Sequence, residues 1–236
     1  MSEEVDTRVS LSLHPFNVTK LDGFDESTAP YLAPSQTAFS EAYVGIGNVH
    51  TVREKAKTHP GWSEVQQIIE TQDYADKIFA RVARSFDAAA GNLDRSIGAL
   101  EEQLTAPVAA KAANAVSAEI RTYVRALDTA QRMTFMQRAL DGGDQTSLSA
   151  VLGAPGYLSG LDQRTVEVFT RLHHERATPE VAKRVRAMKA ARDLIGERSG
   201  LVHVELERAV GHSAAKVHAL RRAKNEAERA FVLKEA

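Results

Sequence analysis

The sequence of 236 residues contains no cysteine, few aromatic side chains and no long apolar run. Without cysteine, the chain cannot form disulfides, thiolate zinc sites or a cysteine nucleophile. No segment approaches the roughly 18 consecutive apolar residues that a membrane span needs. Aromatic residues make up 6%, and Trp62 is the single tryptophan. Because alanine, glutamate and arginine are abundant instead, the composition favours closely packed helices.

The N-terminal sequence MSEEVDTRVSLSLHPF has acidic residues where a secretory signal has basic ones, and no apolar core follows. We therefore expect cytosolic synthesis without export by a signal peptide. The net charge is −1, but residues 1–150 carry more acidic than basic side chains, whereas residues 151–236 carry more basic ones. A chain with two such ends can pair head to tail with copies of itself or present its basic end to an anionic partner.

Residues 1–35 have the pattern of an extended, non-helical arm. Val9, Leu11 and Leu13 alternate with serines, which predicts one β-strand. Prolines 15, 30 and 34 are expected to interrupt any helix. Since a lone strand cannot satisfy its own backbone hydrogen bonds, the arm must pack on its own body, add to another subunit or stay disordered until a partner arrives. The residues predicted to dock it are Val9, Leu11, Leu13, Phe16 and Val18.

The strongest helical pattern is a seam of apolar residues spaced three and four apart. It predicts a helix over residues 63–104, with a break favoured at Gly91-Asn92, and either an internal helical hairpin or an intermolecular coiled coil. The seam consists of Ala75, Phe79, Val82, Phe86, Ala89, Leu93, Ile97, Leu100 and Leu104.

Further helices are expected at residues 37–57, from Pro107 to Leu127, at 129–140 ending at Gly142-Gly143, at 162–177, and from Pro179 onward with an interruption at 196–200. Thr146 or Ser147 is expected to cap a short turn before a glycine-rich loop that tucks in Leu158 and Leu161. The chain is thus predicted to be an all-α, multi-helix bundle with an N-terminal arm. Its predicted parts are an arm at 1–35, a bundle at 36–177 and a basic helical segment at 178–236.

The residues that commonly carry chemistry do not converge on a site. His173 and His174 are adjacent and point about 100° apart on a helix, whereas His203 and Glu207 lack a third ligand. Carboxylate pairs such as Glu101-Glu102 fit helix surfaces better than acid–base work. The glycines of VGIGNVH at 44–50 do not match a phosphate-binding loop. We predict no catalytic residue, metal site or cofactor.

Two basic clusters remain as candidate contacts for nucleic acid or for an acidic protein surface. Phosphate binding needs such clustering, but the interspersed glutamates are typical of a self-paired, solvated helix face. The clusters consist of Lys183, Arg184, Arg186, Lys189 and Arg192, and of Arg221, Arg222 and Lys224.

Two stretches resemble helical proteins encoded among the structural genes of tailed bacteriophages and prophages. One is THPGWSEVQQIIETQDYADKI at 58–78; the other is LEEQLTAPVAAKAANAVSAEIRTYVRAL at 100–127 with LSAVLGAPGYLSGL at 148–161. With the helix between them they cover about half of the chain. The resemblance implies a virion or morphogenesis protein, such as a head, neck or internal component, made in the cytoplasm of a bacterial host. It transfers no functional residue.

These observations lead to three functional hypotheses. The first is a non-enzymatic structural subunit of a multi-subunit particle, a phage virion above all, whose arm docks on a neighbouring subunit. The second is a DNA-associated helical protein that uses the basic clusters, and the third is an assembly scaffold or chaperone. The expected partners are copies of the chain or other virion proteins, with nucleic acid as an alternative and without a membrane or small-molecule substrate.

Overall fold

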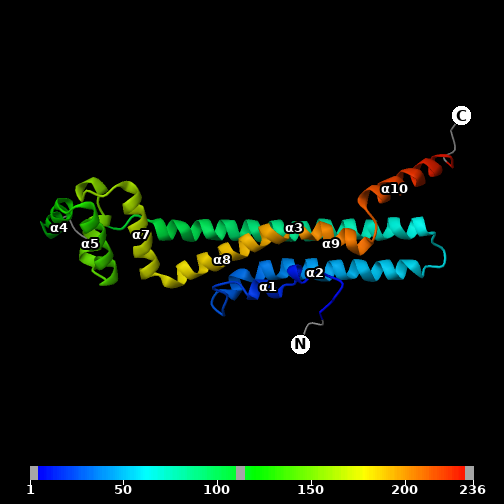
Figure 1. The fold of residues 1–236 in the computed structure, drawn as a ribbon, viewed down its shortest axis with the longest axis horizontal. Helices are drawn as coiled ribbons and strands as arrows, with labels where there is room; N and C mark the ends of the chain where they lie inside the picture. Colours follow the sequence, from blue (N-terminus) through cyan, green and yellow to red (C-terminus); the bar gives the residue numbers. More distant parts are fainter. Residues whose placement is uncertain (1–4, 110–114, 232–236) are drawn as a thin grey trace. The chain divides into compact units, whose positions relative to one another are not determined.

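The computed structural model describes residues 5–109 and 115–231, and in these ranges the protein is all-α, as predicted. The described residues form ten α-helices and two short 3-10 helices, and no strand (Figure 1). The α-helices are α1 (Phe16–Thr19), α2 (Ala29–Lys57), α3 (Glu64–Thr105), α4 (Ala115–Ala126), α5 (Thr129–Asp141), α6 (Gln145–Leu152), α7 (Gln163–Ala177), α8 (Pro179–Arg198), α9 (Leu201–Val210) and α10 (Ala214–Arg229). The 3-10 helices are η1 (Leu11–Leu13) and η2 (Gly156–Leu158).

The chain divides into two compact units rather than at the predicted boundaries. Unit 1 consists of Met1–Asp94 and Ala187–Ala236, and unit 2 of Arg95–Arg186. Each of α3 and α8 runs from one unit into the other. The predicted boundaries at 35/36 and 177/178 fall inside unit 1 and unit 2, respectively. The boundaries were predicted from proline and glycine signals, which mark the ends of helices. The ends of helices need not coincide with the boundary between two units, because one long helix can contribute a face to each of two cores.

The long helix α3 confirms the predicted seam. It covers Glu64–Thr105, and most seam residues are buried, including Val82, Phe86 and Leu93. The predicted break at Gly91-Asn92 is wrong, since the helix continues through both residues. A glycine within a helix costs about 1 kcal/mol relative to alanine, and burial of the neighbouring Ala89 and Leu93 offsets a cost of that size.

Helix α2 begins earlier than predicted and includes two of the prolines that were expected to interrupt it. Pro30 falls in the first turn, where its missing N–H has no intrahelical acceptor. Pro34 lies within the helix and leaves only the carbonyl of Pro30 without its usual donor. The ring of Phe39 meets that of Phe86 edge-on at 5.0 Å, which joins α2 to α3 inside unit 1.

The strand predicted at Val9, Leu11 and Leu13 is wrong. Residues 11–13 form η1, and the hydroxyl of Ser10 accepts a hydrogen bond from the amide of Ser12. Such local bonds from serine compete with extended backbone. Instead of an extended arm, residues 5–28 form turns, η1 and α1, which lie on α2. Of the three interpretations of the arm, the structure agrees with packing on its own body.

Unit 2 has its own apolar core, formed by α4 to α7 and the loop before α7. The buried residues are Val124, Met136, Ala139, Leu140, Leu148, Val151, Leu152, Leu161 and Phe169. The predicted end of α5 at Gly142 is confirmed, and Asp128 and Gln131 form a capping box at its start.

Three details of unit 2 differ from the prediction. Asp144, not Thr146 or Ser147, caps α6, since it lies one residue before the helix and its side chain accepts from the amide of Ser147. Leu158 is 36% exposed, although Leu161 is buried as expected. Residues 107–109 are not helical, so the helix predicted from Pro107 is wrong at its start; α4 is described from Ala115, and residues 110–114 lie outside the described ranges.

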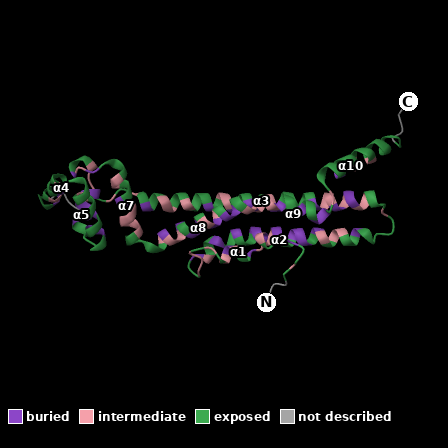
Figure 2. Ribbon diagram, viewed as in Figure 1, coloured by how far each residue is buried: buried purple, intermediate pink, exposed green. Residues whose placement is uncertain are grey.

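The start of α8 and the interruption before α9 follow the prediction, whereas the break at residues 211–213 between α9 and α10 was not predicted. Pro179 is the first residue of α8, and Ser199-Gly200 separates α8 from α9 within the expected interruption. In unit 1, α9 packs along α2. Figure 2 shows buried residues along α2 and α9, whereas α10 is almost wholly exposed.

Candidate interaction site

One side of the N-terminal segment, residues 5–28, is anchored in unit 1. Val9, Leu13 and Val18 are 4%, 0% and 0% exposed. The bare backbone of Gly47 on α2 allows this close approach, because a Cβ there would lie only 2.8 Å from Oδ2 of Asp6. Three of the five predicted docking residues are therefore used inside the chain's own fold.

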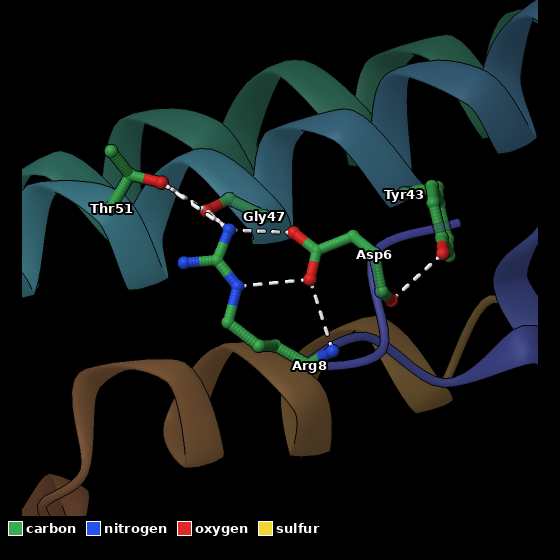
Figure 3. Close-up of polar contacts among 5 residues, drawn as sticks. All are labelled: Asp6, Arg8, Tyr43, Gly47 and Thr51. Carbon is green, nitrogen blue, oxygen red and sulfur yellow. Dashed lines mark hydrogen bonds and ion pairs between the residues drawn. The ribbon is translucent and has the colours of Figure 1, made fainter. Parts of the chain in front are cut away.

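A set of polar contacts, which we call the N-terminal latch, joins Asp6 and Arg8 to Tyr43, Gly47 and Thr51 of α2 (Figure 3). Arg8 Nη2 lies 2.7 Å from Asp6 Oδ2 and donates to Thr51 Oγ1 at 3.4 Å and to the Gly47 carbonyl at 3.5 Å. The Tyr43 hydroxyl donates to the Asp6 carbonyl at 2.8 Å. The hydrogen bond from Arg8 lowers the pKa of Asp6 to about 2. Because this ion pair is largely solvated, its role is to orient the segment more than to stabilise it.

Helices α8 and α9 hold the segment at a second place. The amide of Ser10 donates to Glu205 at 3.1 Å, and Arg198 donates to the Ser12 carbonyl at 2.9 Å. These contacts satisfy backbone groups of a segment that has no sheet of its own. Sequence patterns did not reveal them, because no periodicity links residues so far apart in the chain.

His50 lies beneath the latch. Its Nε2 is buried without a hydrogen-bond partner among the described residues. Burial lowers the pKa of His50, and the nearby charges of Arg8 and Arg53 lower it further, whereas Asp6 acts in the opposite direction. A neutral imidazole is therefore favoured while the segment is in place.

The opposite side of the segment carries the other two predicted docking residues. Leu11 is 61% exposed and Phe16 is 50% exposed. Lys20 Nζ lies 4.1 Å above the Phe16 ring, and the His14 ring meets it edge-on. The segment is thus two-sided, with an anchored inner face and two large apolar side chains toward solvent.

Unit 1 also contains a groove between α3 and α9, which the sequence pattern did not predict. Two adjoining hollows of about 260 Å³ each share Phe79 and His203 as lining residues. Phe79 is 42% exposed, although the seam predicted it as a core residue, and its ring meets that of His203 edge-on at 6.0 Å.

The first predicted basic cluster is divided between the two units. Lys183, Arg184 and Arg186 belong to unit 2, whereas Lys189 and Arg192 belong to unit 1. Nε of Arg192 lies 3.0 Å from Oδ1 of Asp94, so this cation is paired within unit 1.

The second basic cluster lies on α10 and is partly paired as well. Arg221 Nη2 contacts both Asp73 and Asp76, the latter at 2.9 Å. Lys224 lies 3.8 Å from Glu228, whereas Arg222 is exposed. These ion pairs agree with a self-paired helix face more than with a dedicated phosphate-binding surface.

The histidines singled out in the sequence lie apart from one another or make ordinary contacts. His174 Nε2 lies 2.8 Å from the carbonyl of Ala106, the residue that directly follows α3. Within the described ranges, no group of three or more His, Asp or Glu side chains is arranged to hold a metal ion. In the same ranges, no helix combines the length and apolar character needed to cross a membrane.

Comparisons of the chain with protein-family models, with curated proteins and with solved structures find no match.

Proposed function

We propose that the chain is a non-enzymatic structural subunit of a multi-subunit particle and that its N-terminal segment contacts a neighbouring subunit. The observation that supports this is the two-sided segment. Val9, Leu13 and Val18 anchor one face, whereas Leu11 and Phe16 extend from the other. A segment held in this way presents apolar side chains in fixed positions.

The energetics favour such a contact. Full burial of a leucine or phenylalanine contributes roughly 1.5 to 3 kcal/mol. Because the inner contacts already order the backbone around Leu11 and Phe16, docking loses little further conformational entropy. A neighbouring subunit with an apolar recess therefore gains most of the burial energy of these two side chains.

The particle that we favour is a tailed-phage virion. This part of the proposal is based on the resemblance of residues 58–78, 100–127 and 148–161 to helical proteins of phage structural genes. Mass spectrometry of purified particles distinguishes a virion component from an assembly scaffold or chaperone. A virion component stays in the finished particle, whereas a scaffold is present only in precursors.

Replacement of both exposed side chains in the full chain, Leu11→Ser with Phe16→Ser, tests the docking face. We expect light scattering after size-exclusion chromatography to give a mass above 25.7 kDa for the unmodified chain and a lower mass for the double variant. Val168→Ser is the matched control, since Val168 is 49% exposed and lies in unit 2. Equal masses for the unmodified chain and the double variant would refute the docking face.

Association with DNA is the second candidate function, and the exposed position of Arg222 on α10 favours it. Phosphate contacts weaken as salt rises, so a gel shift at two salt concentrations detects them. If α10 binds DNA, Arg222→Glu with Arg229→Glu weakens the shift at low salt. An unchanged shift, or none for the unmodified chain, excludes this function.

A further inference from the structure

The turn between α9 and α10 lies close against α2 at a glycine. Gly211 ends α9 in the left-handed conformation with a φ of 80°, and its amide donates to the Glu207 carbonyl. The Arg53 guanidinium of α2 lies against this backbone, because a Cβ on Gly211 would be only 2.7 Å from Nη1 of Arg53 and closer still to its Cζ. A residue without a side chain is therefore needed here both for the turn and for the approach of Arg53.

Arg53 also lines a hollow of about 260 Å³, all of whose lining residues belong to unit 1. Its apolar lining consists of the buried Ile68 and Val210. Its polar lining includes Arg53 and Lys57 of α2 and His212 of the turn. Pockets for drug-sized ligands have volumes of roughly 300 to 1,000 Å³, so this hollow suits a smaller ligand.

The charge of Arg53 is not neutralised inside unit 1. Among the described residues, the guanidinium of Arg53 has no ion pair or hydrogen bond. Cations in the last turn of a helix complement its dipole, which accounts for Lys57, but Arg53 lies one turn earlier. A half-buried guanidinium with its donors unused is suited to bind an oxyanion.

His212 and Lys216 add donors beside Arg53. Nζ of Lys216 lies 3.3 Å from Nδ1 of His212. Because an ammonium group can only donate, Nδ1 accepts, and the proton of the neutral imidazole is on Nε2. Burial lowers the pKa of His212, and the charges of Lys216 and Arg53 lower it further, whereas Glu64 acts in the opposite direction. His212 therefore lines the hollow as a neutral ring with one N–H group to donate.

Two carboxylates lie near these cations. Glu64 is the carboxylate among the lining residues, and it is exposed in the first turn of α3, where it can turn toward solvent. Glu54 pairs with Lys57 at 2.8 Å, and because both side chains are exposed the pair contributes little. The three cations Arg53, Lys57 and Lys216 thus outnumber the two carboxylates.

We propose that this hollow, which we call the Arg53 hollow, binds a phosphate dianion, either free or as the terminal group of a small phosphate monoester. The planar guanidinium fits two phosphate oxygens, and the lysines and the His212 N–H supply further donors. The apolar Ile68 and Val210 are available to the organic part of an ester. The inference goes beyond the proposed function, since such binding needs no neighbouring subunit.

Isothermal titration calorimetry of the full chain with inorganic phosphate tests this inference. The buffer contains neither phosphate nor sulfate, and sodium chloride of matched ionic strength is the reference titration. We expect saturable binding whose dissociation constant rises about tenfold or more in Arg53→Met, because a charge-assisted hydrogen-bond donor is lost. Arg81→Met is the matched control, since Arg81 is an exposed arginine of α3 that does not line the hollow, and it should leave the dissociation constant unchanged.

Variants at exposed positions provide the second arm of the test. Lys216→Met should also weaken phosphate binding, and it keeps the test valid if Arg53→Met fails to fold. Glu64→Gln should tighten binding about twofold or more, because it removes a negative charge from the lining. Asp87→Asn, at an exposed carboxylate of α3 outside the hollow, is the control for Glu64→Gln.

A parallel titration with glycerol phosphate identifies the source of the phosphate group. Tighter binding of glycerol phosphate than of inorganic phosphate assigns the hollow to a monoester, and equal binding assigns it to the free ion. No saturable binding of either probe, or equal dissociation constants for Arg53→Met and the unmodified chain, would overturn the inference. Binding of a DNA oligonucleotide without binding of either small probe would overturn it as well.

The outcomes separate this inference from the proposed function. Arg53→Met should leave the mass in light scattering unchanged, whereas Leu11→Ser with Phe16→Ser should leave phosphate binding unchanged. If phosphate binds to a chain that is monomeric in every form, only the proposed function fails. If the chain assembles but binds no phosphate, only the inference fails.

Discussion

The backbone amide of Ser10 donates a hydrogen bond of 3.1 Å to Oε2 of Glu205, although 195 residues separate them. Glu205 is 4% exposed, and its other oxygen accepts from Arg208 at 2.6 Å. A buried carboxylate of α9 thus secures the backbone of the N-terminal segment where Leu11 and Phe16 turn outward. We expect the presentation of these two side chains to depend on this bond.

Removal of that acceptor should release the segment. We expect Glu205→Ala to lower the free energy of unfolding by about 1 to 3 kcal/mol, because the Ser10 amide is left without a partner. Hydrogen exchange at Ser10 should accelerate as well. Urea unfolding and exchange mass spectrometry measure the two effects.

Glu197→Ala is the control for this experiment, since Glu197 is exposed on neighbouring α8. It should change the unfolding free energy by less than about 0.5 kcal/mol. Equal effects of the two substitutions would show that Glu205 does not anchor the segment.

Two helical glycines should respond in opposite ways to alanine. A Cβ at Gly45 would lie 2.8 Å from Cγ2 of Ile78 on α3, whereas one at Gly98 would have nothing within 4 Å. We expect Gly98→Ala to stabilise the chain by about 0.5 to 1 kcal/mol, and Gly45→Ala to destabilise it by about 1 to 2 kcal/mol through overpacking. Urea unfolding of both variants is the measurement, and stabilisation by Gly45→Ala would disprove the close approach of α2 and α3.

The stability of the folded chain should fall in mild acid. Burial lowers the pKa of His50, so the folded chain binds fewer protons than the unfolded chain, whose histidines titrate near about 6.5. By linkage, this contribution is complete above that pH and is lost as the pH falls through about 6.5 toward the folded value. His173 and His212 have lowered pKa values for the same reason and add to the loss.

His50→Asn isolates the part that belongs to the latch. The difference in unfolding free energy between about pH 7.5 and about pH 5.5 should shrink in this variant but not vanish, since His173 and His212 remain. His203→Asn, at an exposed position on α9, is the control. An unchanged difference in His50→Asn would mean that His50 is not buried beneath the segment.

Arg132 should be the most sensitive arginine of unit 2. Its guanidinium donates to the carbonyls of Val124, Arg125 and Gly160, at 3.2, 3.0 and 2.7 Å. It therefore ties the end of α4 to the loop before α7. We expect Arg132→Met to lower the unfolding free energy by about 1.5 to 3 kcal/mol, measured with urea.

Arg138→Met is the matched control for Arg132→Met, because Arg138 lies on the same helix and is exposed. It should cost less than about 0.5 kcal/mol. If the two variants unfold at the same urea concentration, the three carbonyl contacts do not stabilise unit 2.

The sequence predicted those parts of the fold that depend on local physics. Apolar spacing along α3, glycine after α5 and proline at the start of α8 each act through neighbouring residues. The N-terminal strand was mispredicted because alternation at Val9, Leu11 and Leu13 is too short to outweigh the serine-capped turn and the contacts with α2 and α9. Those contacts join residues far apart in the chain, and periodicity carries no information about them.

The candidate surfaces were predicted only in part. Five apolar residues were expected to dock the N-terminal segment, and the fold buries Val9, Leu13 and Val18 while it exposes Leu11 and Phe16. The groove beside Phe79 was missed because a seam residue is assigned to the core by spacing alone. Whether such a residue is covered depends on tertiary packing, which spacing does not predict.

Sedimentation equilibrium of the full, unmodified chain over a wide concentration range tests the central claim most directly. If the chain is an assembly subunit, its mean mass rises with concentration above 25.7 kDa, and Leu11→Ser with Phe16→Ser shifts that rise to higher concentration. A mass of 25.7 kDa at every concentration would contradict the account.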